Sequence, residues 1–270
     1  MIRENVYGHG KRLEWILARV RRSDTIVEFG CGTGSMITIP LARMGYAVSG
    51  VDADGNSIAY GRDLCREAGV DPEILRVGGG AEGGPKPDVI IASEVLEHVP
   101  AEELPGLLAG LRNTLRERGA LLVTVPNGYG WFELESLLWY KVGLGKAIEM
   151  LRIDRAVRKL KRILLGEGIE AYYHNTPSTL SPSPHVQRFT LPAIRLLLER
   201  HGFDVVEVHG SVMFSGPFSN LLFTGVKTAM ALNAFLGGRV PAAAAGFYLA
   251  CRRSLEHGKG APGTEGNRVR

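Results

Sequence analysis

The feature that most constrains the fold is a glycine loop that follows a short apolar run. Residues 25–29 read Thr-Ile-Val-Glu-Phe, which is typical of a buried β-strand. Glycine then occupies every second position, at Gly30, Gly32 and Gly34, and residues 35–44 are predicted to form a helix. A strand, a glycine loop and a helix in this order let a nucleotide-like ligand lie against bare backbone. A side chain at these glycines would hold such a ligand away.

The glycine spacing distinguishes between classes of ligand. A dinucleotide fingerprint has a third glycine three positions after the second, where this chain has Ser35 or Ile37, depending on the starting glycine. The sequence instead reads Glu-Phe-Gly-Cys-Gly-Thr-Gly from Glu28 to Gly34. This pattern resembles the first motif of class I S-adenosylmethionine (SAM) dependent methyltransferases.

A second predicted strand, 47–51, ends in Asp52, which is followed by Ala53. A carboxylate at this place can accept hydrogen bonds from both hydroxyl groups of a ribose. We therefore predict that Asp52 binds the ribose of the cofactor. The alternative is a surface aspartate that starts a turn before the helix predicted at 56–68.

The contact to the adenine is the place where the sequence departs from the pattern it resembles. The resemblance implies an acidic residue directly after the third strand, predicted at 74–77. That place is taken by Gly80, and Ala81 and Glu82 follow it. Glu82, a backbone carbonyl or packing alone remain open as the means of holding the adenine.

The fourth predicted strand, 87–92, ends in Ser-Glu-Val-Leu-Glu-His, residues 93–98. Together with the glycine loop, this strand end resembles the small-molecule branch of the class I methyltransferases, which includes quinone-ring O-methyltransferases. The resemblance covers residues 25–127 and returns near the C-terminus. Methyltransferases that act on amino groups of bases often carry Asn/Asp-Pro-Pro-aromatic here, so a nucleic-acid methyltransferase is the less favoured alternative.

The resemblance implies SAM as the cofactor, held at the ends of the first four strands. The predicted cofactor-binding residues are Glu28, Gly30, Cys31, Gly32, Gly34, Asp52, Ala53, Ala81, Glu82 and Ser93.

Strands alternate with helices up to a fifth strand at 120–125, which predicts a parallel, doubly wound α/β sheet. Two more strands are predicted at 203–208 and 246–251. The resemblance implies that the last strand inserts antiparallel beside the sixth. We therefore expect a Rossmann-like, seven-stranded, mostly parallel sheet with helices on both faces. A single domain is expected over 1–253, followed by a disordered tail.

Two insertions depart from this alternation. The first, 131–185, is the expected acceptor cover and contains a basic stretch, 141–165, predicted to be helical. That stretch is either a solvated helix packed on the core or a contact for an anionic acceptor or a membrane surface. The second, 212–245, is apolar, with a helix predicted at 219–236. Core packing, a homodimer contact and a lipid-like acceptor are its alternatives.

The chemistry implied by SAM needs its methyl group to be held in line with the acceptor, and no metal is required. A hydroxyl acceptor must lose a proton, for which histidine is the usual base at neutral pH. His98, His174 and His185 are the candidates, and we favour His185 and His98. Glu94 and Glu97 flank His98, where they could orient it; a divalent ion there is the less favoured alternative.

The overall prediction is therefore a SAM-dependent methyltransferase that acts on a small-molecule acceptor, with oxygen favoured as the attacking atom. A membrane-associated or lipid-linked acceptor is an alternative. Another alternative function is that of a non-catalytic subunit, which keeps the methyltransferase fold and supports a partner enzyme. The net charge of +4 is too small to argue for nucleic acid.

The cysteines and the apolar segments bear on the compartment. Cys31, Cys65 and Cys251 are too widely scattered to suggest a disulfide framework, so the reducing cytoplasm is expected. The first 22 residues show no apolar signal core. Residues 218–236 come nearest to a membrane span but contain polar and charged residues.

Overall fold

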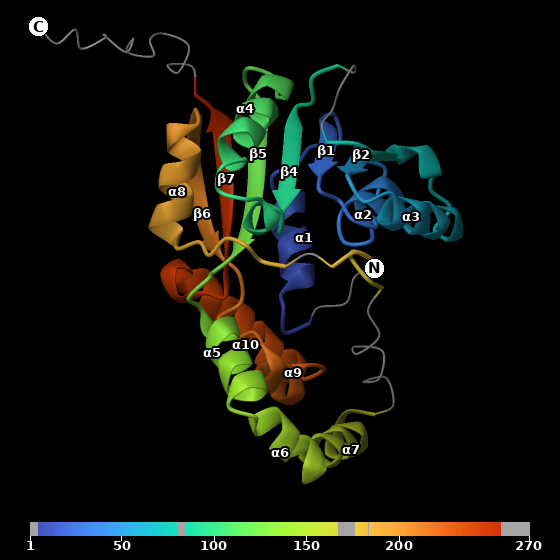
Figure 1. Cartoon of the computed structure of the whole chain (residues 1–270). Coiled ribbons are helices and arrows are strands. Elements are labelled where there is room, and N and C mark those ends of the chain that lie inside the picture. The colour runs from blue at the N-terminus through green and yellow to red at the C-terminus, as the bar shows by residue number, and fades with distance from the viewer. Residues whose placement is uncertain (1–4, 80–84, 167–175, 183, 255–270) are drawn as a thin grey trace, which may run out of the picture.

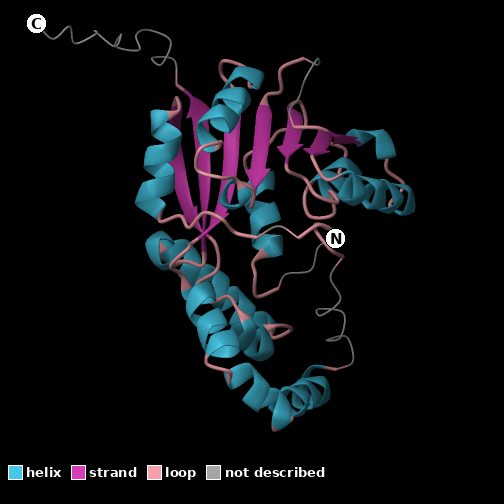
Figure 2. Ribbon diagram, in the orientation of Figure 1, coloured by secondary structure: helices cyan, strands magenta, loops and turns pink. Residues whose placement is uncertain are grey.

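The computed structural model describes residues 5–79, 85–166, 176–182 and 184–254. A seven-stranded sheet in the order β3-β2-β1-β4-β5-β7-β6 forms the centre of the molecule, as Figures 1 and 2 show. Its strands are β1 (Thr25–Phe29), β2 (Ala47–Asp52), β3 (Leu75–Val77), β4 (Val89–Ser93), β5 (Ala120–Pro126), β6 (Phe203–Gly210) and β7 (Gly246–Arg253).

The sheet is parallel from β3 to β5, and β7 runs antiparallel between β5 and β6. The predicted mixed, seven-stranded Rossmann-like sheet is therefore confirmed. The chain order reverses between β1 and β4, where Phe29 pairs with both Val51 and Ala92. In an open α/β sheet, such a reversal creates a crevice at the carboxyl ends of the strands.

Helices cover both faces of the sheet. Near the sheet lie α1 (His9–Leu17), α2 (Thr38–Arg43), α3 (Gly55–Glu67), α4 (Leu104–Thr114) and α8 (Leu191–Arg200). Short 3-10 turns occur at η1 (Pro72–Ile74), η2 (Leu96–His98) and η5 (Pro241–Ala243). A second group, which we call the helical arm, extends beyond one end of the sheet in Figure 1. The arm consists of α5 (Trp131–Ser136), the π-helical turn η3 (Leu137–Lys141), α6 (Leu144–Met150), α7 (Ile153–Leu165), α9 (Pro217–Phe223) and α10 (Lys227–Arg239).

Alternation along the central strands divides the core into two layers. Ile90 and Ala92 of β4 point into the layer that contains α4 and α8, whereas Val89 and Ile91 point into the layer that contains α1 and α2. Successive side chains of a strand face opposite sides of a sheet, so a strand covered on both faces must be apolar throughout. The run Val89–Ser93 meets this requirement, because its first four residues are buried.

Several helices differ from their predicted bounds. The single helices expected at 141–165 and 219–236 are each split, with breaks where Arg152 and Gly225 adopt positive φ angles of 55° and 85°. A residue in this left-handed region cannot continue a right-handed helix. The helix expected from residue 35 begins only at Thr38, where the backbone N–H is capped by the Glu28 carboxylate.

The sequence predicts an amphipathic helix over residues 9–22, and the helix observed there, α1, ends earlier, at Leu17. Thr190 caps α8, because its Oγ1 accepts a hydrogen bond from the N–H of Ala193 at 3.3 Å. Among the described residues, no helix has the length and apolar character needed to cross a membrane. The predicted tail beyond residue 254 lies outside the described residues.

The contact between α3 and the glycine loop gives a test of the fold. A Cβ at Gly61 would lie 2.3 Å from the carbonyl oxygen of Thr33, so Gly61→Ala must displace the loop backbone. We expect it to lower the free energy of unfolding by roughly 1–3 kcal/mol, measured by urea denaturation. Gly110→Ala in α4 is the matched control, because open space surrounds the added methyl group. That control should raise stability by about 0.4–1 kcal/mol, and equal effects of the two changes would contradict the packing described.

Candidate functional site

A cavity of about 530 Å³ opens at the carboxyl ends of β1, β2 and β4. This is the crevice expected where the strand order reverses, and its size is in the ordinary range for small-molecule sites. Most of the predicted cofactor residues that the structure describes line it. These are Glu28, Gly30, Cys31, Gly32, Asp52, Ala53 and Ser93.

The glycines of the loop differ in what they do. Gly30 and Gly32 line the cavity with φ angles of 68° and 54°, and a Cβ on Gly30 would lie 2.5 Å from the side chain of Val95. Gly34 is not among the lining residues. A Cβ there would lie 2.8 Å from Leu75, so Gly34 allows the loop to pack closely against β3. Its predicted place beside the ligand is therefore not what the structure shows.

The acidic residue of the first motif lies beneath the loop and is buried. The Glu28 carboxylate accepts hydrogen bonds from both the backbone N–H and the hydroxyl group of Thr38, at the start of α2. Burial raises the pKa of Glu28 to about 7, although the two hydrogen bonds from Thr38 oppose this shift. Glu28 thus ties the end of β1 to the start of α2.

Asp52 lies in the cavity wall and accepts two hydrogen bonds from backbone N–H groups. Its oxygens lie 2.7 Å from the N of Gly32 and 2.8 Å from the N of Asp54. A carboxylate offers about four lone-pair sites, so acceptor capacity remains for a ligand. Asp52 therefore both fixes the glycine loop and presents a negative charge to the cavity.

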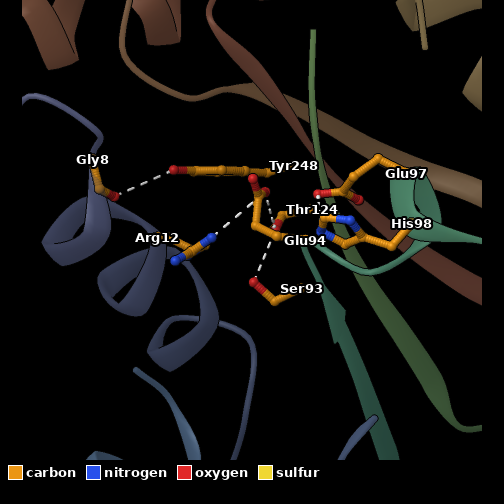
Figure 3. A network of polar contacts seen from close by, with 8 residues as sticks. All are labelled: Gly8, Arg12, Ser93, Glu94, Glu97, His98, Thr124 and Tyr248. Atoms are coloured by element: carbon orange, nitrogen blue, oxygen red, sulfur yellow. Dashed lines mark hydrogen bonds and ion pairs between the residues drawn. The ribbon is translucent and has the colours of Figure 1, made fainter. Parts of the chain in front are cut away.

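The end of β4 carries a network of polar contacts, which Figure 3 shows. The Glu94 carboxylate accepts from the hydroxyl group of Thr124 at 2.8 Å and forms an ion pair with Arg12 at 3.5 Å. Ser93 Oγ also lies 2.9 Å from Thr124 Oγ1. Glu94 itself adopts a positive φ of 56°, an uncommon backbone conformation for a residue with a side chain, and such outliers gather at functional sites.

His98 and His185 lie together, although 86 residues separate them in the chain. Their ring centroids are 5.0 Å apart in an edge-to-face arrangement, and His98 lines the cavity whereas His185 does not. The backbone N–H groups of Val186 and Gln187 both donate to the carbonyl oxygen of Glu97, at 2.8 and 2.9 Å. These hydrogen bonds hold the segment that carries His185 against the end of β4.

Glu97 completes this group, which we call the Glu97–His98–His185 cluster. Its carboxylate is fully buried, and neither oxygen has a hydrogen-bond partner in the described structure. One ligand atom from each of the three residues lies within 4.8 Å of the others, so the cluster could hold a metal ion. The less favoured alternative from the sequence was a divalent ion beside His98 with Glu94 and Glu97, and the structure brings His185 to this group in place of Glu94.

The charge states follow from burial. Burial, with a smaller contribution from the charge of Glu94, raises the pKa of Glu97 well above its ordinary value. Burial and the neighbouring His98 lower the pKa of His185. A lowered pKa favours the neutral imidazole at pH 7, which is the form that can accept a proton or bind a metal ion.

One prediction about the first insertion needs correction. We expected residues 131–185 to cover the acceptor and not the cofactor site, but residues 177–182 lie on the glycine loop. The carbonyl oxygen of Ser178 accepts from the N–H of Thr33 at 2.9 Å, and the N–H of Leu180 donates to the hydroxyl group of Ser57 at 2.8 Å. The physical reason is that backbone C=O and N–H groups of this segment form hydrogen bonds with the glycine loop and with the start of α3. Ala81, Glu82 and His174 lie outside the described residues.

Sequence reasoning missed several residues that line the cavity. His9 and Arg12 come from α1, and Ser178, Thr179 and Ser181 come from the segment on the glycine loop. Burial lowers the pKa of His9 to about 4, and Arg12 adds to this shift. A signal was present for α1, because Arg12 lies four residues before the buried Ile16 and therefore on the same side of that helix. No local pattern pointed to the residues of the segment.

Comparison with known families agrees with this geometry. A family described as "Methyltransferase domain" matches residues 6–208, about three quarters of the chain. The chain belongs to this family. The resemblance to class I SAM-dependent methyltransferases, drawn first from the glycine loop and the end of β4, is thereby confirmed.

Curated relatives share only part of their length with this chain. The chain is 31% identical over 132 residues to the ubiquinone biosynthesis O-methyltransferase of Methylobacterium nodulans, covering 43% of this chain and 53% of that protein. It is 27% identical over 163 residues to the protein of the same name from Caulobacter vibrioides, covering 57% and 58%. The matched region thus spans little more than half of these relatives.

Solved structures show the same fold at low sequence identity. Magnesium protoporphyrin IX methyltransferase from Synechocystis, solved with bound S-adenosylhomocysteine, aligns with a TM-score of 0.52 at 17% identity, covering 91% of this chain and 82% of that one. A SAM-dependent methyltransferase from Methanosarcina mazei aligns with a TM-score of 0.54 at 17% identity, covering 90% and 98%.

The raised pKa of Glu28 predicts how the stability of the protein depends on pH. The pKa of the folded state, about 7, exceeds the ordinary value of 4.5. The stabilisation from the neutral carboxyl is therefore complete below pH 4.5 and is lost as the pH rises through 7. Glu28→Gln cannot ionise, so the difference in unfolding free energy, variant minus wild type, should rise by roughly 1–3 kcal/mol between pH 5 and 8.

Denaturation of the ligand-free protein at several pH values measures this difference. Glu102→Gln is the control, because Glu102 is exposed and its replacement should leave the pH dependence unchanged. A constant difference between wild type and Glu28→Gln over this pH range would contradict the assigned protonation of Glu28.

Proposed function

We propose that the protein transfers the methyl group of SAM to an oxygen of a small-molecule acceptor. The observation that carries the proposal is the joint position of the glycine loop, Asp52 and His98 on one cavity. The loop and Asp52 suit a nucleoside-like cofactor, and His98 suits an acceptor that must lose a proton. The family and the resemblance to quinone-ring enzymes support the same reaction.

The cavity wall has the features that SAM requires. Gly30 and Gly32 present bare backbone to the cavity, and Asp52 retains acceptor sites for the two ribose hydroxyl groups. When bound, SAM supplies a methyl group that its sulfonium has already activated. The chain then has to hold the acceptor in line with that group and exclude competing geometries, which can supply much of the rate enhancement.

The Glu97–His98–His185 cluster would prepare the acceptor. His98 faces the cavity, so its ring is the better placed of the two to take a proton from a hydroxyl group. His185 lies against the His98 ring and would orient it. Pro184 also fixes the ring, because its carbonyl oxygen lies 3.1 Å from Nδ1 of His98.

A divalent cation is a second candidate for the same role. The buried carboxylate of Glu97 supports it, because neither oxygen has a hydrogen-bond partner in the described structure and Nε2 of His98 lies 3.8 Å away. A buried carboxylate is costly unless a hydrogen bond or a cation satisfies it. Two imidazoles and a carboxylate are a donor set that suits first-row transition metal ions and zinc. Loss of turnover on treatment with a chelator, restored by a divalent ion, would favour this candidate over proton removal by histidine alone.

The identity of the acceptor and the location of the protein are further parts of the proposal. A small-molecule acceptor methylated on oxygen agrees with the curated relatives, which are ubiquinone biosynthesis O-methyltransferases. Nucleic acid as a substrate is not favoured, because β4 ends in Ser93 and Glu94 instead of the Pro-Pro-aromatic sequence. The three cysteines are free and buried, which agrees with the reducing cytoplasm proposed from the sequence.

The assignment of Asp52 predicts the effect of removing its side chain. Asp52→Ala loses charge-assisted acceptors for the ribose and releases the N–H of Gly32, so SAM binding should weaken by roughly 1.5–3 kcal/mol. Isothermal titration calorimetry with SAM measures this loss directly. Asp63→Ala, which removes an exposed carboxylate of α3, is the matched control and should bind SAM like wild type. Unchanged affinity of Asp52→Ala would exclude the ribose contact.

The proposed role of the Glu97–His98–His185 cluster predicts that changes to its histidines affect turnover but not SAM binding. His98→Gln and His185→Gln should each leave SAM affinity near the wild-type value. Each should lower turnover by roughly 10²- to 10⁴-fold with acceptors that must lose a proton. Transfer of labelled methyl groups from SAM to a panel of phenols and catechols measures turnover. His201→Gln is the control, because His201 lies at the end of α8 and contacts the Leu197 carbonyl oxygen instead of the cavity.

The opposite result has a defined meaning. If the His98 and His185 variants lose SAM binding but keep full turnover at saturating SAM, the cluster serves the cofactor and the proposed role is wrong.

A further inference from the structure

The basic segment of the helical arm contrasts in charge with the rest of the chain. Residues 141–166 contain eight lysines and arginines and two acidic residues, a net charge of +6. Because the whole chain carries +4, all other residues together carry −2. The positive charge is therefore concentrated on α6, α7 and the turns beside them, and this region would be attracted to an anionic surface.

The same segment exposes large apolar side chains. Met150, Ile163 and Leu164 are 80%, 71% and 70% exposed, and Leu151 and Leu160 are also mostly exposed. Single exposed leucines are common on proteins, but a group of them on two consecutive helices marks an interaction surface. We call these residues, with the basic residues between them, the arm tip.

The sequence of α7 separates its apolar and basic residues. Ile153, Leu160 and Leu164 recur at spacings of seven and four residues, so they share one side of the helix. The exposed Arg155 and Lys159 lie outside that stripe. A helix with an apolar stripe flanked by cations is the type that lies flat in the headgroup region of a bilayer, with its aliphatic chains buried and its cations among the phosphates.

Contacts to α9 hold this helix in place with its apolar stripe exposed. Nζ of the buried Lys161 donates to the carbonyl oxygen of Thr224 at 2.9 Å, which ties one side of α7 to the end of α9. In Figure 1, α6 and α7 lie at the end of the arm that is farthest from the sheet. A flat surface can therefore reach the arm tip without meeting the sheet.

We propose that the arm tip docks the protein on an anionic lipid bilayer. Charge complementarity favours an anionic bilayer over a second copy of the chain as the partner, because a symmetric dimer through this surface would bring two segments of charge +6 together. It also favours a bilayer over nucleic acid, because contacts to phosphates do not account for the exposed apolar side chains. The proposal does not rest on methyl transfer, because docking requires neither SAM nor an acceptor.

Sedimentation with sucrose-loaded vesicles tests the proposal on the full chain. Vesicles of phosphatidylcholine with 30% phosphatidylglycerol are compared with vesicles of phosphatidylcholine alone, each at low and at physiological salt. We expect the protein to bind the anionic vesicles at least about tenfold more tightly than the neutral ones, and to bind them less tightly as salt increases.

Two double variants separate the apolar from the electrostatic contribution. Ile163→Ser with Leu164→Ser should lower the partition coefficient on anionic vesicles by at least about tenfold at both salt concentrations. Arg155→Glu with Lys159→Glu should lower it by a similar factor at low salt and by less at high salt. Leu196→Ser on α8 and Arg118→Glu, each an exposed residue outside the arm, are the matched controls and should bind like wild type.

Circular dichroism and SAM titration of every variant establish that folding and the cofactor cavity are intact, so loss of docking is distinguishable from failure of the proposed function.

The proposal is overturned if wild type does not bind anionic vesicles, or if both arm-tip variants bind them as tightly as wild type. It is also overturned if analytical ultracentrifugation shows a lipid-free dimer that the Ile163 and Leu164 changes dissociate. Tighter binding to duplex RNA than to anionic vesicles would likewise assign the surface to another partner.

Discussion

The site depends on two acidic side chains, Glu28 and Asp52, that fix the glycine loop and the helix that follows it. Glu28 binds the first residue of α2 from below the loop, and Asp52 binds the N–H of Gly32 from the neighbouring strand. The loop itself contributes three residues with positive φ, a conformation that only glycine adopts without strain. Without these hydrogen bonds, such a loop would have many accessible shapes, and the cavity wall would not be fixed.

The local parts of this arrangement could be predicted from the sequence. The strand ends, the glycine loop and Asp52 are short-range features, and the direction of parallel strands brings them to one edge of the sheet. The buried strand at Val89–Ser93 was equally clear, because a continuous apolar run fits a strand covered on both faces. The bounds of the helices were less accurate, since tertiary contacts such as that between Glu28 and Thr38 decide where α2 begins.

The parts that could not be predicted depend on contacts between distant segments. His98 and His185 were each candidates, but their contact follows from backbone hydrogen bonds to Glu97 that no local pattern encodes. The role of Arg12 as partner of Glu94 likewise depends on how α1 lies against the end of β4. Residues 177–182 are held on the glycine loop by backbone hydrogen bonds, which any residue type can form, so the sequence does not predict them.

The segment from Ser178 to Gln187 is anchored at both ends, and this has a consequence for how the protein can vary. One anchor is the N–H of Thr33 on the glycine loop, and the other is the carbonyl oxygen of Glu97 after β4. The number of residues between the anchors is thus set by the distance from one strand end to the next. Insertions should be tolerated in the arm before this segment, whereas a single added or deleted residue within it would move His185 away from His98.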